Sequence, residues 1–436
     1  MLNFKDNQLL AQTGPGTPMG EAIRRYWLPA LLSWELPEPD CTPVRVKLLG
    51  EELIAFKDTD GSIGLIDNYC PHRRASMFFG RNEECGLRCV YHGWKFDVNG
   101  NCVDMPSEPA ESNFKDKVKI ASYPCMELGG VIWTYMGPPE TQAPPPQFEW
   151  ARAPATHRAV NKVLQECNWL QGLEGGVASV HAPWLHNNDL ANTTKFETRS
   201  AAPRIEVEPT DYGYAYGSVR HLSQEEGNFV RAYQYIMPFT QLRPDGGRGE
   251  EAPSIGGHMW VPMDDENHMV WNFIYGLGDE PLTEAQKYKN GDAAYEVIDI
   301  HNGFRCIWNG DNDYGIDREV QRTQTFTGIL ADARVGANLQ DRGIQESMGQ
   351  LVDRTREHLA TTDNGIIATR RMLLEAVRTV EDGGSPKGVN PSYHKVRSLQ
   401  RVLPVEARWQ DAMRGVLFDG DEYKPAWLAD LTTQGG

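Results

Sequence analysis

Several features that mark common protein classes are missing from this chain of 436 residues. It has no run of about 18 apolar residues, so the sequence predicts no membrane-spanning helix. Residues 1–20 contain no apolar stretch behind a basic start, which argues against a signal peptide. Basic residues are outnumbered, 43 against 60 acidic ones, and the net charge of −17 disfavours nucleic acid or an anionic membrane as a partner. We therefore expect a cytoplasmic protein.

A dinucleotide-binding glycine motif is also missing, because GPGTPMG near the start does not follow a strand. The chain is therefore not expected to bind NADH itself. Disulfides are rare in the cytoplasm, where clustered cysteines indicate a metal site instead. Four of the eight cysteines fall between Cys70 and Cys102. This clustering makes metal binding the first function to consider.

The length exceeds that at which single hydrophobic cores stop growing, so we expect more than one domain. Residues 1–37 are predicted to form a helical lead-in that packs on the larger, C-terminal domain, with Thr17 capping a helix that starts at Pro18. Short β-prone runs separated by turn signals, such as Asn99-Gly100, predict a small all-β domain over residues 38–145.

The proline-rich stretch GPPETQAPPPQFEW marks the boundary to the second domain, residues 146–436. Strand patterns such as YGYAYGSVR, FVRAYQYIMPF and HMVWNFIYG come first and predict a central antiparallel sheet. From TEAQKYKNGDAAYEVIDIH onward the pattern is mainly helical, and Gly383-Gly384 is expected to end the last long helix. The fold class is therefore α+β.

The segment CPHRRASMFFGRNEECGLRCVYHGW holds two short cysteine–histidine pairs, Cys70-x-His72 and Cys89-x-x-His92. Two thiolates and two imidazoles can hold the two irons of a Rieske [2Fe–2S] cluster, and imidazoles on one iron raise its potential to about −150 to +300 mV. The alternative is a structural zinc site, but zinc-binding pairs normally have two or more residues between their ligands.

The segment resembles the Rieske domain of ring-hydroxylating oxygenases, down to CPHR and CVYHGWKFDVNG. GPGTPMGEAIRRYWLPA, NWLQGLEGG and DRTREHL are similar to the phthalate 4,5-dioxygenase branch, and the likeness extends over nearly the whole chain. The resemblance implies the oxygenase component of a system that uses O₂ to cis-dihydroxylate an aromatic carboxylate, phthalate at the 4,5 positions above all. Isophthalate, another benzoate or an O-demethylation substrate remain alternatives.

A hydroxylating enzyme needs a second metal site, and two histidines with one carboxylate suit an Fe(II) that reacts with O₂. His181 and His186 are the candidate imidazoles. Five residues apart, they would point about 140° away from each other on a regular helix. Pro183 between them can interrupt the helix and let both side chains face one metal.

Several acids in NLQDRGIQESMGQLVDRTREH could supply the carboxylate. The resemblance favours Asp341, because related oxygenases place a ligand aspartate in a helix with a glutamate five residues later, here Glu346. Asp353 is the second choice, and Glu357 is interpreted as solvated.

Ala178 stands three residues before His181, where the family usually has an aspartate. In the family that carboxylate bridges a Rieske histidine of one subunit and an iron histidine of its neighbour, and the loss of such a partner commonly costs about 10–100-fold in activity or metal affinity. Three interpretations stay open. Ala178 is an engineered substitution, or another acid such as Glu174 replaces the bridge, or the assumed register is wrong.

A buried substrate carboxylate needs a cation, and Arg204 and Arg243 fall among the strands of the second domain. Both are therefore candidate substrate residues. The resemblance further implies a separate NADH-dependent flavin and iron–sulfur reductase, and a homotrimer or stacked hexamer. Two functions of another class stay open, an electron carrier that uses only the cluster and a catalytically dead binding protein.

Overall fold

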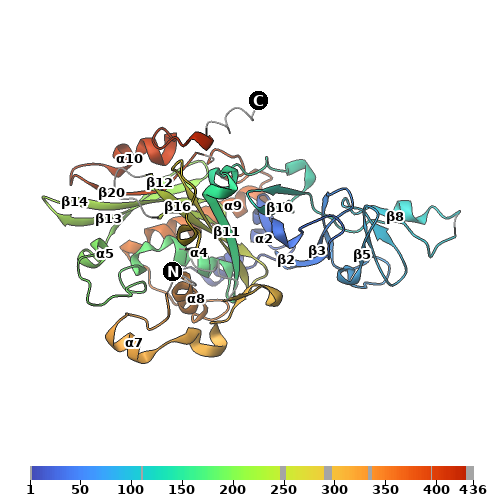
Figure 1. The fold of residues 1–436 in the computed structure, drawn as a ribbon, viewed down its shortest axis with the longest axis horizontal. Helices are drawn as coiled ribbons and strands as arrows, with labels where there is room; N and C mark the ends of the chain where they lie inside the picture. Colours follow the sequence, from blue (N-terminus) through green and yellow to red (C-terminus); the bar gives the residue numbers. More distant parts are fainter. Residues whose placement is uncertain are drawn as a thin grey trace. The chain divides into compact units, whose positions relative to one another are not determined.

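The computed structural model describes residues 2–109, 111–245, 252–288, 297–331, 336–393 and 395–428 (Figure 1). The chain forms two units, Thr13–Ala143 and Met1–Gln12 with Pro144–Gly436. The predicted lead-in of residues 1–37 is thus divided between them. Only α1 (Phe4–Ala11) belongs with the larger unit, where its last two carbonyl groups accept hydrogen bonds from Trp169 and Asn168.

The smaller unit consists of short antiparallel sheets, as the sequence predicts. Thr17 caps α2 (Pro18–Ile23) by accepting a hydrogen bond from the Gly20 N–H. Asn99-Gly100 forms a turn in which Gly100 has a φ of +77°, a conformation that favours glycine. The sheets are β1 (Trp27–Leu32), β10 (Val131–Tyr135) and β9 (Cys125–Leu128); β2 (Val44–Leu48), β3 (Glu51–Lys57) and β4 (Ile63–Asp67); and β5 (Arg81–Asn82), β6 (Leu87–Arg88), β7 (Lys95–Phe96) and β8 (Cys102–Asp104).

An eight-stranded antiparallel sheet forms the centre of the larger unit, which confirms the predicted architecture. The strands lie in the order β11-β17-β16-β15-β14-β13-β12. The eighth strand, β20, pairs with residues 228–232 of β14, which β15 leaves unpaired. Their bounds are β11 (Arg158–Gln165), β12 (Arg204–Pro209), β13 (Gly213–Ser223), β14 (Gly227–Ile236), β15 (Thr240–Asp245), β16 (Ser254–Pro262), β17 (His268–Gly276) and β20 (Leu399–Leu403).

Both faces of this sheet are covered, which explains why β13 and β14 read as nearly continuous runs of buried residues. On one face Ala215 and Val219 pack with Trp409 in a hydrophobic cluster. On the other face Tyr214 reaches Thr369, with 2.7 Å between their hydroxyl oxygens. Because both faces are covered, polar side chains of these strands are buried as well. Some of these buried polar groups can therefore take part in a binding site.

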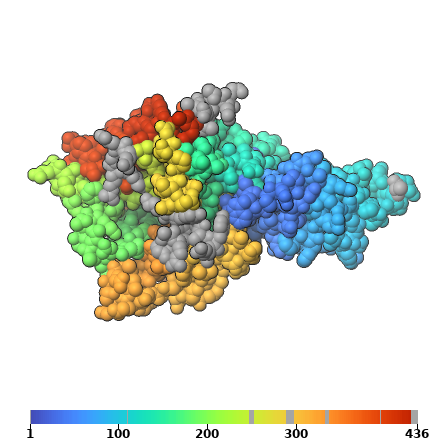
Figure 2. Space-filling model, viewed as in Figure 1, coloured from blue at the N-terminus to red at the C-terminus, as the bar shows by residue number. Residues whose placement is uncertain are grey.

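Helices cover the sheet on the side of Tyr214. In Figure 1 α4 (Trp169–Val177) lies against the sheet, where it contacts β16, and it also contacts α8 (Asn338–Glu346) and α9 (Asn364–Glu381). Helix α9 ends just before Gly383, whose φ is +80°, as the sequence predicts. The remaining helices are α3 (Glu149–Arg152), α5 (Phe196–Arg199), α6 (Glu284–Tyr288), α7 (Arg318–Thr323) and α10 (Trp409–Ala412), and α7 (orange) is exposed in Figure 2.

The helical prediction from TEAQKYKNGDAAYEVIDIH onward is wrong over part of that segment. Helix α6 is followed by residues 289–296, which lie outside the described residues, and then by β18 (Ile298–Asp299), which pairs with β19 (Arg305–Cys306). The β-branched residues of EVIDI favour a strand once a partner is present. In the part of the chain that the structure describes, no helix has both the length and the apolar composition needed to cross a bilayer.

A buried ion pair joins α3 to the chain beside β20 in the larger unit. Arg397 donates to both carboxylate oxygens of Glu149 over 2.6 and 2.8 Å, and the Tyr275 hydroxyl donates to the same carboxylate over 2.8 Å. The Arg397 side chain has no exposed surface. Its charge therefore depends on Glu149 for compensation.

We expect Glu149→Gln to lower the free energy of unfolding of the larger unit by about 3–5 kcal/mol, because it leaves a buried cation without its partner. Urea denaturation measures this loss. The control is Glu319→Gln, whose partner Arg322 is 71% exposed, and it should cost about 0–1 kcal/mol. If the two substitutions lowered the free energy of unfolding equally, Glu149 would not be the partner on which the buried charge of Arg397 depends.

Candidate functional site

Two glycines let other elements approach the end of α4 closely. A Cβ atom on Gly175 would lie 2.1 Å from Nε2 of Gln345 in α8. A Cβ atom on Gly176 would lie 2.0 Å from the Trp260 ring in β16. Side chains at these positions would push α8 and β16 away, so the GG pair fixes how near these elements come to the segment that carries His181.

After α4 the chain makes a short 3₁₀ turn, Ser179–His181, and then a non-helical turn that includes Pro183 and His186. The two histidines thus do not share a regular helix, as predicted, but α4 already ends at Val177, so Pro183 is not the residue that ends it. The two imidazole rings lie 4.9 Å apart, centroid to centroid, at 83° to each other.

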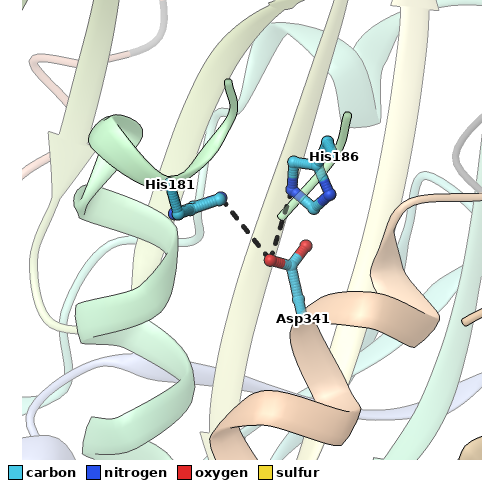
Figure 3. A group of neighbouring side chains, drawn as sticks. All are labelled: His181, His186 and Asp341. Atoms are coloured by element: carbon cyan, nitrogen blue, oxygen red, sulfur yellow. Dashed lines mark ion pairs between the residues drawn. The ribbon is translucent and has the colours of Figure 1, made fainter. Parts of the chain in front are cut away.

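Helix α8 brings Asp341 against this turn (Figure 3). Asp341 Oδ1 lies 3.5 Å from Nε2 of His181 and 3.4 Å from Nε2 of His186. This carboxylate oxygen is buried and has no hydrogen-bond donor among the described residues. A divalent metal with open coordination positions fits such a donor set of two imidazoles and one carboxylate.

The protonation of these groups suits a metal. Burial opposes the ionisation of Asp341, but the two imidazoles outweigh it and lower its pKa to about 2. Burial lowers the pKa of His181. Burial also acts to lower the pKa of His186, yet Asp341 and Gln340 raise it overall. At neutral pH the site therefore offers an anionic carboxylate beside a histidine that burial keeps neutral.

The other acids proposed from the sequence lie elsewhere. Asp353 is exposed and accepts hydrogen bonds from Thr355. Glu357 pairs with Arg370, which corrects its interpretation as a solvated acid. Glu346 accepts a hydrogen bond from the Glu166 backbone N–H over 3.0 Å and another from the Tyr314 hydroxyl. None of the three joins the group formed by His181, His186 and Asp341.

Each Cys–His pair of the smaller unit lies in a tight loop. The Cys70 N–H donates to the Ala75 carbonyl over 2.9 Å, and the Cys89 N–H donates to the Trp94 carbonyl over 2.8 Å. Both cysteines are 2% exposed, and burial raises the pKa of the Cys70 thiol to about 11. Thiols of this kind become thiolates when they bind metal.

The two histidines of these loops also face each other. The rings of His72 and His92 lie 4.4 Å apart, and Trp94 stacks on His72 at 4.5 Å. His72 Nδ1 is buried without a hydrogen-bond partner in the described chain, which leaves its lone pair for a metal. The unpaired His72 Nδ1 and the two buried thiols are therefore suitable ligands for a [2Fe–2S] cluster.

A single zinc ion fits these four residues less well. The described residues contain one group of three or more histidine, cysteine or acidic side chains with ligand atoms within 4.8 Å of one another, and that group is His181, His186 and Asp341. The two Cys–His pairs therefore do not converge on one ion, as a tetrahedral zinc site requires.

Ala178 ends α4, and its backbone N–H donates to the Glu174 carbonyl over 3.1 Å. The Glu174 carboxylate, which sequence reasoning offered as a replacement for the bridging acid, is already engaged. It accepts hydrogen bonds from Arg354 over 3.0 and 3.1 Å and from Arg370 over 2.6 Å, all among buried side chains. Glu174 thus anchors α4 to α9 and to the chain after α8.

A cavity of about 290 Å³ opens beside His181, His186 and Asp341. Arg243 of β15 lines it, as proposed from the sequence, and so does Arg231 of β14, which sequence reasoning missed. Arg204 does not line it. That side chain is 68% exposed and pairs with Glu206 on the edge strand β12, so the proposed substrate role of Arg204 is wrong.

A buried hydrogen-bond chain holds the Arg243 side chain. Arg243 Nε donates to His258 Nε2 over 3.1 Å, and His258 Nδ1 donates to Asn272 Oδ1 over 2.7 Å. Burial, helped by the charge of Arg243, lowers the pKa of His258 to about 3, so this imidazole stays neutral. The guanidinium group lines the cavity together with Asp245, with 3.7 Å between Arg243 Nη1 and Asp245 Oδ1.

Two family models match this chain. The model of the Rieske [2Fe-2S] domain matches residues 26–124, and the model described as LigXa C-terminal domain like matches residues 134–421. The phthalate 4,5-dioxygenase oxygenase subunit of Pseudomonas putida is 37% identical over 94% of both chains. The 3-chlorobenzoate-3,4-dioxygenase oxygenase subunit of Comamonas testosteroni is 37% identical over 94% of this chain and 97% of its own.

Among solved structures, NdmA of Pseudomonas putida CBB5, a QL mutant with theobromine, is similar with a TM-score of 0.61 at 19% identity. The match covers 86% of this chain and 96% of that one and shows a shared fold. With a Rieske domain, a matching second domain and full-length relatives of this kind, the chain belongs to the Rieske-type aromatic ring-hydroxylating oxygenases, on the branch of the phthalate 4,5-dioxygenase oxygenase subunit, and carries a [2Fe–2S] cluster and a mononuclear iron.

Proposed function

We propose that this oxygenase component cis-dihydroxylates an aromatic carboxylate, with phthalate at its 4,5 positions as the first substrate. The observation that carries the proposal is the cavity beside the His181, His186 and Asp341 group, which three arginines line, Arg231, Arg243 and Arg342. A dianionic aromatic acid needs two cations and an apolar wall, and Arg231, Arg243, Trp260 and Val270 supply them. The name of the 37% identical relative from Pseudomonas putida supports phthalate.

In the proposed reaction both atoms of O₂ enter adjacent ring carbons, and two electrons and two protons complete the balance. Cys70, His72, Cys89 and His92 hold the cluster, and His181, His186 and Asp341 hold the iron. When bound, the cluster supplies single electrons and the iron supplies the place where O₂ is activated. A separate NADH-dependent flavin and iron–sulfur reductase delivers the electrons, and the oxygenase assembles as a trimer or stacked hexamer.

The residues of the chain then have distinct tasks. Arg243 holds a substrate carboxylate, while neutral His258 takes the Nε hydrogen bond and fixes the orientation of the guanidinium. Arg231 lies over the Tyr233 ring at 5.5 Å and takes the second carboxylate. Binding the acidic groups at this wall leaves the opposite edge of the ring free to face the metal.

The first test is metal content. We expect the loaded wild-type protein to hold about three irons per chain, two in the cluster and one at the second site. Asp341→Asn and His186→Ala should fall to about two, with the Rieske absorption unchanged, because they remove ligands of the second site only. The exposed Asp353→Asn is the control and should keep about three. A wild-type content of about two would instead support the electron carrier.

The second test concerns the substrate. We expect Arg243→Gln to raise the KM for phthalate about 10-fold or more, because a charged hydrogen-bond donor to the carboxylate is lost. Arg204→Gln on the exposed edge strand is the matched control and should leave KM unchanged. Product analysis identifies the diol. If phthalate is not converted but isophthalate, another benzoate or a methoxybenzoate is, the substrate assignment fails while the reaction class stands.

The third test addresses position 178, which we propose to be that of the bridging acid. We expect Ala178→Asp to speed the reoxidation of a reduced cluster by about 10–100-fold in a single turnover with phthalate and O₂. The reason is that a carboxylate can accept N–H hydrogen bonds from two imidazoles. Ala178→Asn, of similar size but neutral, is the control. Equal rates in all three proteins would mean that electrons reach the iron without an acid at this position.

A further inference from the structure

Gln340 precedes Asp341 on α8 and has no exposed surface. Its side-chain oxygen accepts a hydrogen bond from His186 Nδ1 over 2.9 Å. Its amide nitrogen lies 2.7 Å from Asn188 Oδ1, 3.1 Å from Thr327 Oγ1 and 3.2 Å from the Ile329 carbonyl. One buried amide therefore connects α8 to the turn after His186 and to the chain near residue 329.

The surroundings fix which way this amide points. The Ile329 carbonyl can only accept a hydrogen bond, so the NH₂ end of Gln340 must face it. The carbonyl end of the amide must then face His186. Because an amide oxygen can only accept, His186 has to carry its proton on Nδ1.

The tautomer matters because the other nitrogen of His186 faces Asp341. Nε2 lies 3.4 Å from Asp341 Oδ1, on the side where the iron is proposed to bind. With the proton held on Nδ1, the Nε2 lone pair is free for a metal. We infer that Gln340 is a positioning residue that selects the metal-binding tautomer and the ring orientation of His186, an inference that rests on the proposed iron site.

A glutamine suits this position better than a glutamate. An ionised carboxylate at position 340 could accept from His186, but it could not donate to the Ile329 carbonyl. It would also place a second anion next to Asp341. The amide provides the acceptor for His186 and two N–H donors on its other side, without adding charge to the site.

The experiment compares Gln340→Met with wild type, because methionine has nearly the same length but no hydrogen-bonding amide. Co(II) is the probe, and its affinity for the cluster-loaded protein is measured by competition with a chelator. We expect Gln340→Met to bind Co(II) about 10–100-fold more weakly, with an altered visible Co(II) spectrum. Gln340→Glu retains an acceptor for His186 and should bind more tightly than Gln340→Met.

A matched control separates this role from a general loss of packing. Gln234 of β14 is also fully buried, accepts from the Tyr212 hydroxyl and donates to the Arg397 and Leu417 carbonyls. Gln234→Met removes an equivalent set of hydrogen bonds away from the cavity. We expect it to lower the unfolding midpoint about as much as Gln340→Met does and to leave Co(II) affinity unchanged.

The outcomes distinguish the two levels of the proposal. Wild-type affinity and spectrum in Gln340→Met, with a loss of stability like that of Gln234→Met, would overturn the inference about Gln340. Co(II) binding that survives in Asp341→Asn and His186→Ala would instead overturn the iron site itself. If Gln340→Met does not fold, Gln340→Glu decides: because it keeps the acceptor for His186, a Co(II) affinity as low as that of His186→Ala would overturn the inference.

Discussion

The placement of one partly buried carboxylate, that of Asp341, governs the catalytic half of this molecule. A carboxylate that loses water must find cations, donors or a metal. Here two imidazoles from a single turn face the same oxygen, and they come from a segment far away in the sequence. Helix α8 packs against the C-terminal end of α4, which contains Gly175 and Gly176, and this packing brings Asp341 to the two histidines. The sheet, in turn, supports α4 through its contact with β16.

The buried charges around the site are paired in a way that gives them separate tasks. Glu174 is shared by Arg354 and Arg370, so its charge is used to hold α4 in place and is not available to a neighbouring imidazole. Arg243 donates its Nε hydrogen to a neutral histidine, lies 3.7 Å from Asp245 and lines the cavity.

Sequence reasoning worked where the information is local or carried by resemblance. The cysteine–histidine pairs lie within single loops, so their spacing is visible in the sequence. His181 and His186 are close in the sequence, and Pro183 between them indicated that they would not lie on one regular helix. Asp341 could be named only through resemblance, because nothing local distinguishes it from Asp353; the tertiary packing of α8 makes the difference.

The errors have physical causes of the same kind. Arg204 and Arg243 both lie on strands, and composition does not reveal that β12 is an edge strand with its arginine in water. Arg231 did carry a signal, since a charge inside the buried run FVRAYQYIMPF has to find a polar destination. The lead-in was misassigned because residues 27–32 complete a sheet with β10, and strand pairing over such a separation has no local signature.

The smaller unit has an asymmetry that bears on electron flow. The two thiols that we assign to the cluster are each 2% exposed, whereas both histidines are partly exposed. The His92 ring also lies 4.0 Å from that of Tyr91, which is 56% exposed. The histidines that would hold the cluster are therefore nearer the surface than the cysteines. Imidazoles also keep an N–H through which a hydrogen bond to another group can form, which buried thiolates lack. The partly exposed imidazoles would therefore be available to a hydrogen-bonding group outside these loops, whereas the buried thiolates would not.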